Sequence, residues 1–171
     1  MTDLEQRARA FATHHHALVG QKRKYTGDPY IVHPASVAAI VKGVSHTVEM
    51  VAAAWLHDTV EDTLATFEEI ENEFGIAVRE LVEWLTDTSR SEDGNRAVRK
   101  AIDRARLARA PAAAQTVKLA DLIDNTASIL AHDPKFARIY LSEKAALLEV
   151  LTSGDRELWA RANACAITPS R

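Results

Sequence analysis

The segment WLHDTVEDT places four ionisable side chains at the end of an apolar run, VAAAWL. His57 and Asp58 close this run, and Glu61 and Asp62 follow four residues after them. Burying a charge is costly unless the charge is paired or bound to a metal, so packing alone does not account for these residues. Positions four apart share a helix face, so the four groups should form two adjacent ladders if the helix or a tight turn continues that far.

A metal site needs more ligands than two neighbours can offer. His33, in YIVHP, and Asp121, in VKLADLIDN, are the expected additional ligands, and Asp121 is set among apolar neighbours as Asp58 is. A mixed nitrogen and oxygen set of this kind suits Mn²⁺, Fe²⁺, Zn²⁺ or Mg²⁺. Asn125 follows Asp121 by four residues and should share its helix face. The sequence therefore predicts a divalent metal site, if the fold brings these segments together.

Helical periodicity dominates the elements that must position this site. Apolar residues recur at spacings of three and four from Leu4 to Leu18, and the segment GQKRKYTGDPYI then breaks the pattern as a loop. Pro34 is suited to open the next helix, and His33 before it is biased toward an extended conformation. Further helices are expected at residues 47–58, 66–75, 76–87, 95–108, 112–130, 133–151 and 156–165. The expected fold is all-α, a single domain over residues 1–171 with about eight to ten helices.

Residue types also predict where several helices begin and end. Thr66 and Glu69 form a capping box at one helix start, and Gly75 suits the C-cap of the same helix. Asp133 before Pro134 is typical of an N-cap, and Gly154 is expected to end the helix that reaches residue 151. No alternating apolar and polar run is long enough to predict a strand.

Composition narrows the class of protein. The chain has 171 residues, 47% of them hydrophobic and 26% charged, with a net charge of −3, which argues against general attraction to nucleic acid or an anionic membrane. Phosphate binding, if present, must be local. The lone Cys165 excludes an intramolecular disulfide, and neither a secretory signal nor a membrane-spanning run is found, so a cytoplasmic location is expected.

Three other features have simpler interpretations than a functional site. The triplet His14, His15 and His16 points in different directions on a helix, which favours a partly solvated face over a metal site. The basic segment NRAVRKAIDRARLAR has an apolar stripe and a cationic face, as a solvated helix does. The three tryptophans lie among aliphatic residues and are expected in the core: Trp55, Trp84 and Trp159.

The order YIVHP, LHDTVEDT, TFEEIENEFG, LVEWLTD and VKLADLIDN resembles the HD-domain phosphohydrolases. Within them it is most similar to alarmone hydrolases of the RelA/SpoT type in their small stand-alone form, over about residues 8–150. This resemblance implies an all-helical, Mn²⁺-dependent enzyme that binds one divalent ion. Its substrate would be a hyperphosphorylated guanosine nucleotide such as ppGpp, from which it would remove the 3′-pyrophosphate.

The resemblance also implies roles for individual residues. The metal ligands would be His33, His57, Asp58 and Asp121. The catalytic pair would be Glu61 and Asp62, which would orient water or exchange protons. The substrate-binding residues would be Arg23, Lys24, Asn125 and Arg138, the last by approximate register.

Two departures from the family pattern affect the nucleotide pocket. Many guanosine-specific members carry arginine two positions after the asparagine, where this chain has Ala127, and the loop KRKYTGDPYIVH is one residue longer than the commonest form. The alternatives are therefore a (p)ppApp hydrolase, a broader 3′-phosphorylated-nucleotide hydrolase, and a non-catalytic module that senses nucleotides. A homodimer is compatible with the sequence, because the last helix can pack internally or at a dimer interface.

Overall fold

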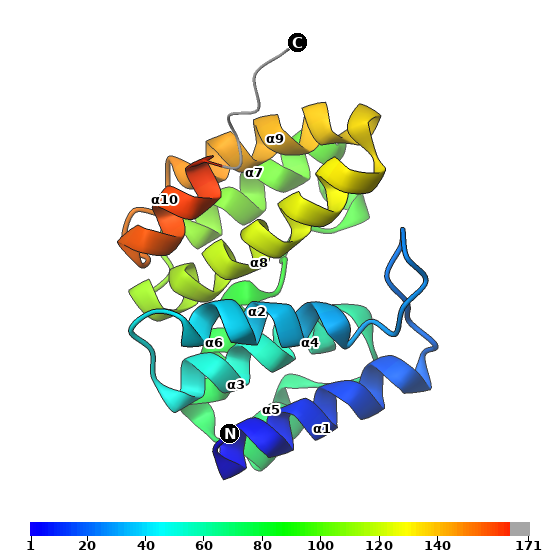
Figure 1. Cartoon of the computed structure of the whole chain (residues 1–171), viewed down its shortest axis with the longest axis vertical. Coiled ribbons are helices and arrows are strands. Elements are labelled where there is room, and N and C mark those ends of the chain that lie inside the picture. Colours follow the sequence, from blue (N-terminus) through cyan, green and yellow to red (C-terminus); the bar gives the residue numbers. More distant parts are fainter. Residues whose placement is uncertain (165–171) are drawn as a thin grey trace. The chain divides into compact units, whose positions relative to one another are not determined.

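A computed structural model describes residues 1–164 as two compact units of helices (Figure 1). The first unit, Met1–Thr86, contains α1 (Asp3–Leu18), α2 (Val32–Lys42), α3 (Val48–Leu56), α4 (Thr59–Asp62), α5 (Phe67–Phe74) and α6 (Ile76–Leu85). The second, which begins at Asp87, contains the 3₁₀ turn η1 (Ser91–Asp93), α7 (Arg96–Leu107), α8 (Ala112–His132), α9 (Pro134–Leu148) and α10 (Arg156–Ala164).

These assignments confirm the all-α class, since no strand occurs within residues 1–164. The single-domain organisation stays a prediction, and Cys165 lies outside the described residues. In the same part of the chain, no helix is long and apolar enough to cross a membrane.

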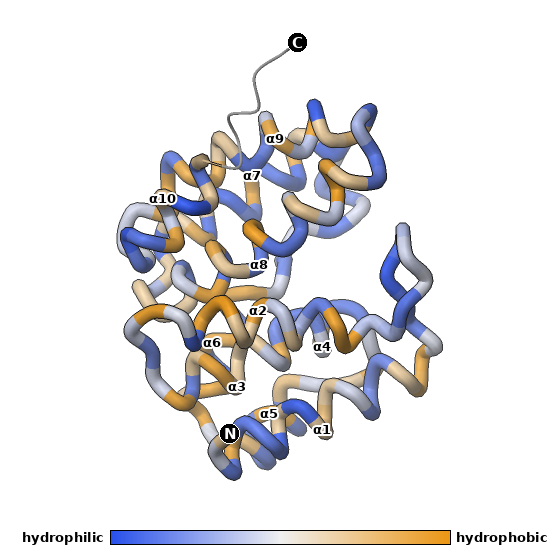
Figure 2. Tube along the Cα trace, viewed as in Figure 1, coloured by the Kyte–Doolittle hydropathy of each residue, from blue (hydrophilic) through white to orange (hydrophobic). Residues whose placement is uncertain are grey.

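Helix α3 forms the centre of the first unit. Every residue from Met50 to Leu56 is buried, and α1, α2 and α6 pack against this helix. Figure 2 shows its apolar character. The buried carboxylate of Glu5 joins three of these helices, because its Oε1 accepts hydrogen bonds from Lys42 Nζ at 2.7 Å and from Trp55 Nε1 at 3.4 Å. Trp55 is therefore a core residue, as expected. Its position fixes the helix that ends at His57.

The capping box at Thr66 is present as predicted. Thr66 Oγ1 accepts a hydrogen bond from the Glu69 backbone, and the Glu69 carboxylate accepts one from the Thr66 backbone at 2.8 Å. Gly75 follows the helix with φ of 84°, a conformation that a residue with a Cβ adopts at a cost.

Replacing Thr66 by alanine should lower the free energy of unfolding by about 1 kcal/mol, because the Glu69 amide in the first turn of α5 loses its side-chain acceptor. Urea denaturation followed by circular dichroism measures this change. Thr13→Ala, which removes an exposed hydroxyl from the middle of α1, is the matched control and should change stability by less than about 0.5 kcal/mol. An equal loss in both variants would contradict the assignment.

Helix α8 is the centre of the second unit, where α9 and α10 pack against it. The link between α9 and α10 approaches α8 closely at Gly154, where an added Cβ would lie 2.7 Å from Leu119 Cδ1 and 3.2 Å from the backbone of Gln115. The prediction that Gly154 ends the preceding helix was wrong, because α9 ends at Leu148. The glycine instead permits this close packing.

Two further boundaries differ from the sequence expectation. The helix expected at residues 47–58 ends at Leu56, and a turn at His57 and Asp58 leads into α4. The expectation that His33 is extended was wrong, because α2 begins at Val32. The His33 amide donates to Tyr30 O at 2.9 Å, and Pro34 is tolerated in the first turn, where its missing N–H has no helical acceptor to lose.

The predicted polar loop between α1 and α2 is a short hairpin-like arm (Figures 1 and 2). Lys22 and Pro29 form an isolated antiparallel bridge, and Arg23 N donates to Asp28 O at 2.9 Å. The arm returns the chain to Tyr30, two residues before the start of α2.

Candidate metal centre

Three side chains of the first unit converge as a set of metal ligands. His33 comes from the first turn of α2, while His57 and Asp58 form the turn between α3 and α4. His33 Nε2 lies 3.2 Å from His57 Nε2 and 3.6 Å from Asp58 Oδ2, and His57 Nε2 lies 3.1 Å from the same carboxylate oxygen. Both imidazoles are at most 2% exposed.

These separations fit a divalent cation. Metal–ligand bonds of about 2.1 Å place neighbouring ligand atoms about 3.0–3.5 Å apart, close to the separations of 3.1–3.6 Å found here. Two imidazole nitrogens and a carboxylate oxygen directed at one point, inside the protein, also present several lone pairs that a shared cation satisfies together. The donor set is therefore placed to hold a metal ion.

A backbone contact fixes the proton on one of these imidazoles. His57 Nδ1 lies 2.9 Å from Ala54 O, and a carbonyl can only accept, so the ring proton resides on Nδ1. The Nε2 atom then presents its lone pair toward His33 and Asp58. A hydrogen bond on the far side of a ligating imidazole is the usual device that orients it for a metal.

Tyr30 is a partner of this site that the sequence reasoning missed. Its hydroxyl donates to Asp58 Oδ2 at 2.5 Å, and its ring lies against those of His33 and His16, with centroid distances of 5.7 and 4.7 Å. The short hydrogen bond holds the Asp58 carboxylate in one orientation. Its only sequence signal was its place two residues before a helix start.

The acidic pair lies on α4, one turn beyond Asp58. The Asp62 amide donates to Asp58 O at 2.9 Å, so the turn continues as the four-residue spacing required. Both Glu61 and Asp62 are exposed, in contrast to the buried imidazoles. The pair therefore faces solvent beside the ligand cluster.

Asp62 is held by a chain of hydrogen bonds that reaches a buried histidine. Gln21 Nε2 donates to Asp62 Oδ2 at 2.8 Å, and Gln21 Oε1 lies 2.6 Å from His16 Nδ1, which must therefore be the donor. His16 is 2% exposed, so the solvated-face interpretation of the histidine triplet was wrong for this member, while His14 is exposed as expected. Helical phase accounts for the difference, because His16 follows buried Ala12 by four residues.

Partial desolvation by neighbouring protein atoms shifts the pKa values at both ends of this hydrogen-bond chain in opposite directions, although Asp62 as a whole residue is exposed. It raises the pKa of the Asp62 carboxyl, with the Asp58 carboxylate adding to the shift and the Gln21 hydrogen bond opposing it. It lowers the pKa of His16, against the effect of its hydrogen bond to Gln21. A neutral His16 is consistent with its role as donor through Nδ1 alone.

Asp121 and Asn125 share one face of α8 in the second unit, as predicted. Asp121 is 5% exposed, and its two oxygens accept hydrogen bonds from Asn125 Nδ2 at 2.6 Å and Lys118 Nζ at 2.8 Å. These contacts orient the carboxylate from within its own helix. Its role as a metal ligand beside the three residues of the first unit stays a prediction.

The predicted basic residues lie on two different elements. Arg23 and Lys24 belong to the arm between α1 and α2, where Lys24 Nζ lies 4.9 Å from the centroid of the Tyr25 ring. Arg138 is exposed on α9 and does not line the pocket found in the second unit. Arg96, Lys100 and Arg104 do line that pocket, although the pattern of their segment is typical of a solvated basic helix.

Comparisons with known proteins agree with this arrangement. The family model described as "HD domain" matches residues 8–158. The protein named guanosine-3′,5′-bis(diphosphate) 3′-pyrophosphohydrolase MESH1 from Danio rerio is 41% identical over 100 residues, which cover 57% of this chain and 52% of that protein. A guanosine-3′,5′-bis(diphosphate) 3′-pyrophosphohydrolase from Aquifex aeolicus is 46% identical over 81 residues, 47% of this chain and 11% of that protein.

The fold is also similar to a solved structure. A metazoan ortholog of SpoT, described as hydrolysing ppGpp and acting in starvation responses, superimposes with a TM-score of 0.85 at 26% identity and covers 96% of this chain and 94% of that one. The matched segments span between 8% and 52% of the length of the curated relatives.

Proposed function

This chain belongs to the HD-domain family, and from that premise we propose that it is a metal-dependent pyrophosphohydrolase of hyperphosphorylated nucleotides. The proposed reaction converts (p)ppGpp into GDP or GTP and pyrophosphate. The observation that carries the proposal is the cluster of His33, His57 and Asp58 with an acidic pair one turn away. The names of the Danio rerio and Aquifex aeolicus relatives and the described activity of the SpoT ortholog support the same substrate.

We propose Mn²⁺ as the resident ion, with His33, His57, Asp58 and Asp121 as its ligands. The nitrogen and carboxylate donors suit this ion, and the hydrogen bonds to His57 and Asp58 hold two of the donors in place before binding. When bound, the ion supplies Lewis acidity toward a phosphate oxygen and lowers the pKa of water.

Glu61 and Asp62 are the proposed acid and base. Water adds to the phosphorus attached to O3′, the bond between that phosphorus and O3′ breaks, and pyrophosphate leaves with the water oxygen. One proton passes from water to the enzyme, and O3′ receives one. Asp62, whose pKa is raised by partial desolvation, is the better suited of the two to donate a proton, while Glu61 is suited to accept one.

The substrate-binding residues follow from the chemistry of their side chains. Arg23 and Lys24 would provide charge for the phosphates, and the guanidinium of Arg23 also offers a flat surface for a base. Asn125 would donate or accept a hydrogen bond at the ribose or a phosphate oxygen. Arg138, which is exposed on α9, is proposed only from its approximate register in the family pattern. The cytoplasmic location and the homodimer also stay predictions.

Product analysis tests the proposal directly. Mn²⁺-loaded protein is incubated with ppGpp, ppApp, a cyclic nucleotide and a nucleoside monophosphate, and the products are separated by ion-exchange chromatography. Release of pyrophosphate from ppGpp is expected, and faster release from ppApp would move the specificity to adenosine. If no 3′-pyrophosphorylated nucleotide is cleaved, the hydrolase assignment is wrong, and nucleotide binding without turnover would instead indicate a sensing module.

Gln21 provides a further test of how the acidic pair is positioned. Gln21→Leu removes the donor to Asp62, so kcat should fall about tenfold, the value of one hydrogen bond to a charged group, while KM and metal content stay close to those of the wild type. Steady-state kinetics and metal analysis by mass spectrometry measure these quantities. Gln6→Leu, at an exposed position of α1, is the matched control. Unchanged kcat in Gln21→Leu would remove Gln21 from the mechanism.

A further inference from the structure

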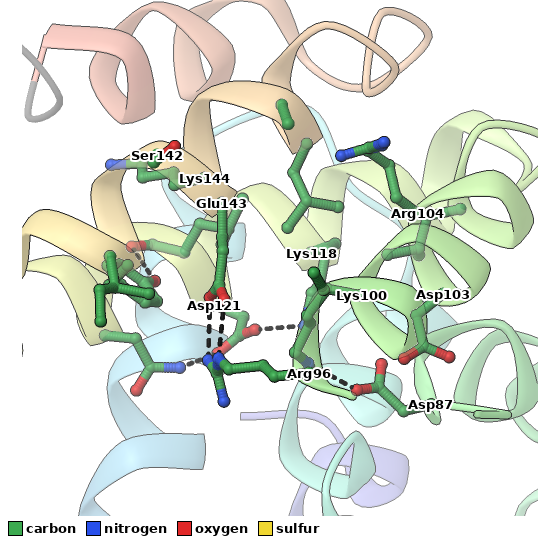
Figure 3. Close-up of a pocket in the computed structure, with 18 residues that line it drawn as sticks. Asp87, Arg96, Lys100, Asp103, Arg104, Lys118, Asp121, Ser142, Glu143 and Lys144 are labelled. Atoms are coloured by element: carbon green, nitrogen blue, oxygen red, sulfur yellow. Dashed lines mark hydrogen bonds and ion pairs between the residues drawn. The ribbon is translucent and has the colours of Figure 1, made fainter. Parts of the chain in front are cut away.

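Helices α7, α8 and α9 enclose a pocket of about 510 Å³ within the second unit (Figure 3). A cavity of this size is in the range that holds a nucleotide-sized ligand. Five cationic side chains line it: Arg96, Lys100, Arg104, Lys118 and Lys144. Four carboxylates line it as well: Asp87, Asp103, Asp121 and Glu143. The pocket therefore contains cations that could bind an anionic ligand, together with carboxylates that compete with such a ligand for those cations.

Arg96 and Glu143 form a pair joined by two hydrogen bonds in this pocket. Arg96 Nε donates to Glu143 Oε1 at 2.7 Å and Arg96 Nη2 donates to Glu143 Oε2 at 2.8 Å, two parallel bonds from α7 to α9 that are visible in Figure 3. The guanidinium also lies over the Phe136 ring, 5.4 Å from its centroid. The hydrogen bonds to Glu143 raise the pKa of Arg96 above its usual value.

This geometry is the one that an arginine presents to a phosphate group. The guanidinium fork binds two oxygens of a carboxylate or a phosphate in the same way, so Glu143 occupies the place that a phosphate would take on Arg96. The Arg96 side chain is 48% exposed and that of Glu143 is 22% exposed. An incoming anion can therefore reach the guanidinium, but must exchange with the carboxylate to bind it with both nitrogens.

We propose that Glu143 sets the affinity of this pocket for phosphate groups by acting as an internal competitor for Arg96. The proposal rests on the proposed function only in naming a nucleotide as the natural bearer of the phosphate. The pocket holds Arg96 in a bidentate pair until a ligand offers two oxygens in its place, and Glu143 then turns away. Glu143 is an affinity-determining residue of the pocket and takes no part in bond cleavage.

A purely structural pair would behave differently. If the pair only joins α7 to α9, removing the carboxylate lowers stability and leaves anion affinity unchanged or weakened. If Glu143 competes for Arg96, the same change raises anion affinity, because the ligand no longer has to break two charge-assisted hydrogen bonds. The sign of the effect on binding separates the two roles.

Calorimetric titration of the full chain with inorganic pyrophosphate measures whether anion affinity rises or falls, and requires no turnover. Glu143→Gln should bind pyrophosphate about five- to tenfold more tightly than the wild type, a moderate gain because the pair is partly exposed. Glu143→Asp, whose shorter side chain should not reach Arg96 with both oxygens, should give a smaller gain. Arg96→Gln combined with Glu143→Gln should lose the gain. Glu83→Gln, which removes the 2.8 Å partner of Arg79 on α6, is the matched control and should not change binding.

Circular dichroism establishes that each variant is folded before titration. Equal or weaker pyrophosphate binding by folded Glu143→Gln and Glu143→Asp overturns the proposal, as does an equal gain in Glu83→Gln or the absence of binding in every variant. A protein that cleaves no 3′-pyrophosphorylated nucleotide but shows the gain in Glu143→Gln would refute the proposed hydrolase and support the competition at Arg96.

Discussion

Replacing Asp58 by alanine is expected to remove the bound divalent ion and to lower the rate of pyrophosphate release by more than about 100-fold. Loss of even an outer hydrogen-bonding partner of a metal ligand commonly costs 10- to 100-fold in affinity or activity, and Asp58 is a proposed direct ligand. Its Oδ2 atom lies within 3.6 Å of both imidazole nitrogens and accepts the Tyr30 hydrogen bond. Without it, two neutral imidazoles of the first unit would face the ion without a counter-charge.

Metal content per chain, measured by plasma mass spectrometry after gel filtration, checks the first half of this prediction, and the rate with ppGpp checks the second. Asp3→Ala, which removes an exposed carboxylate at the start of α1, is the control and should retain both metal and activity. An Asp58→Ala protein that keeps a full complement of Mn²⁺ would show that the ligand assignment is wrong.

The relative placement of the residues in this part of the site could be predicted because they are close in sequence. The four residues lie within one short segment: His57, Asp58, Glu61 and Asp62. If the chain continues through a tight turn, helical geometry places residues four apart on the same face. His33 is different, since its convergence with His57 depends on how α2 packs against α3. The sequence offers His33 as an additional ligand and the family resemblance implies the same role, but neither gives its distance from His57, which the structure places at 3.2 Å between the two Nε2 atoms.

The supporting residues were missed because their sequence signals are weak. Gln21 and Tyr30 act over long separations, 41 and 28 residues from the side chains that they hold, and nothing in their local composition distinguishes them from loop residues. His16 belongs to a triplet of histidines that differ only in helical phase, so its sequence alone does not distinguish it from His14 and His15. Arg96 and Glu143 are 47 residues apart, so the sequence does not indicate their pairing, and the basic segment that contains Arg96 has the pattern of a solvated helix.

A second variant, Glu61→Gln, should separate metal binding from acid and base catalysis. Glu61 is exposed on α4 and is not a member of the ligand cluster, so this change should keep most of the bound metal. It replaces a carboxylate by an amide of the same size, which can orient water but cannot accept its proton. General acid and base catalysis contributes about 10²- to 10⁴-fold, so kcat should fall within that range while KM changes little.

Single-turnover kinetics with ppGpp and metal analysis of the same preparation measure both quantities together. Glu68→Gln, at an exposed position in the first turn of α5, is the matched control for loss of one surface carboxylate and should leave kcat unchanged. The comparison with Asp58→Ala is decisive, because the two variants should be similarly slow but differ in metal content. Equal loss of metal in Glu61→Gln and Asp58→Ala would refute the division of roles, and Glu61 would then have to be counted among the ligands.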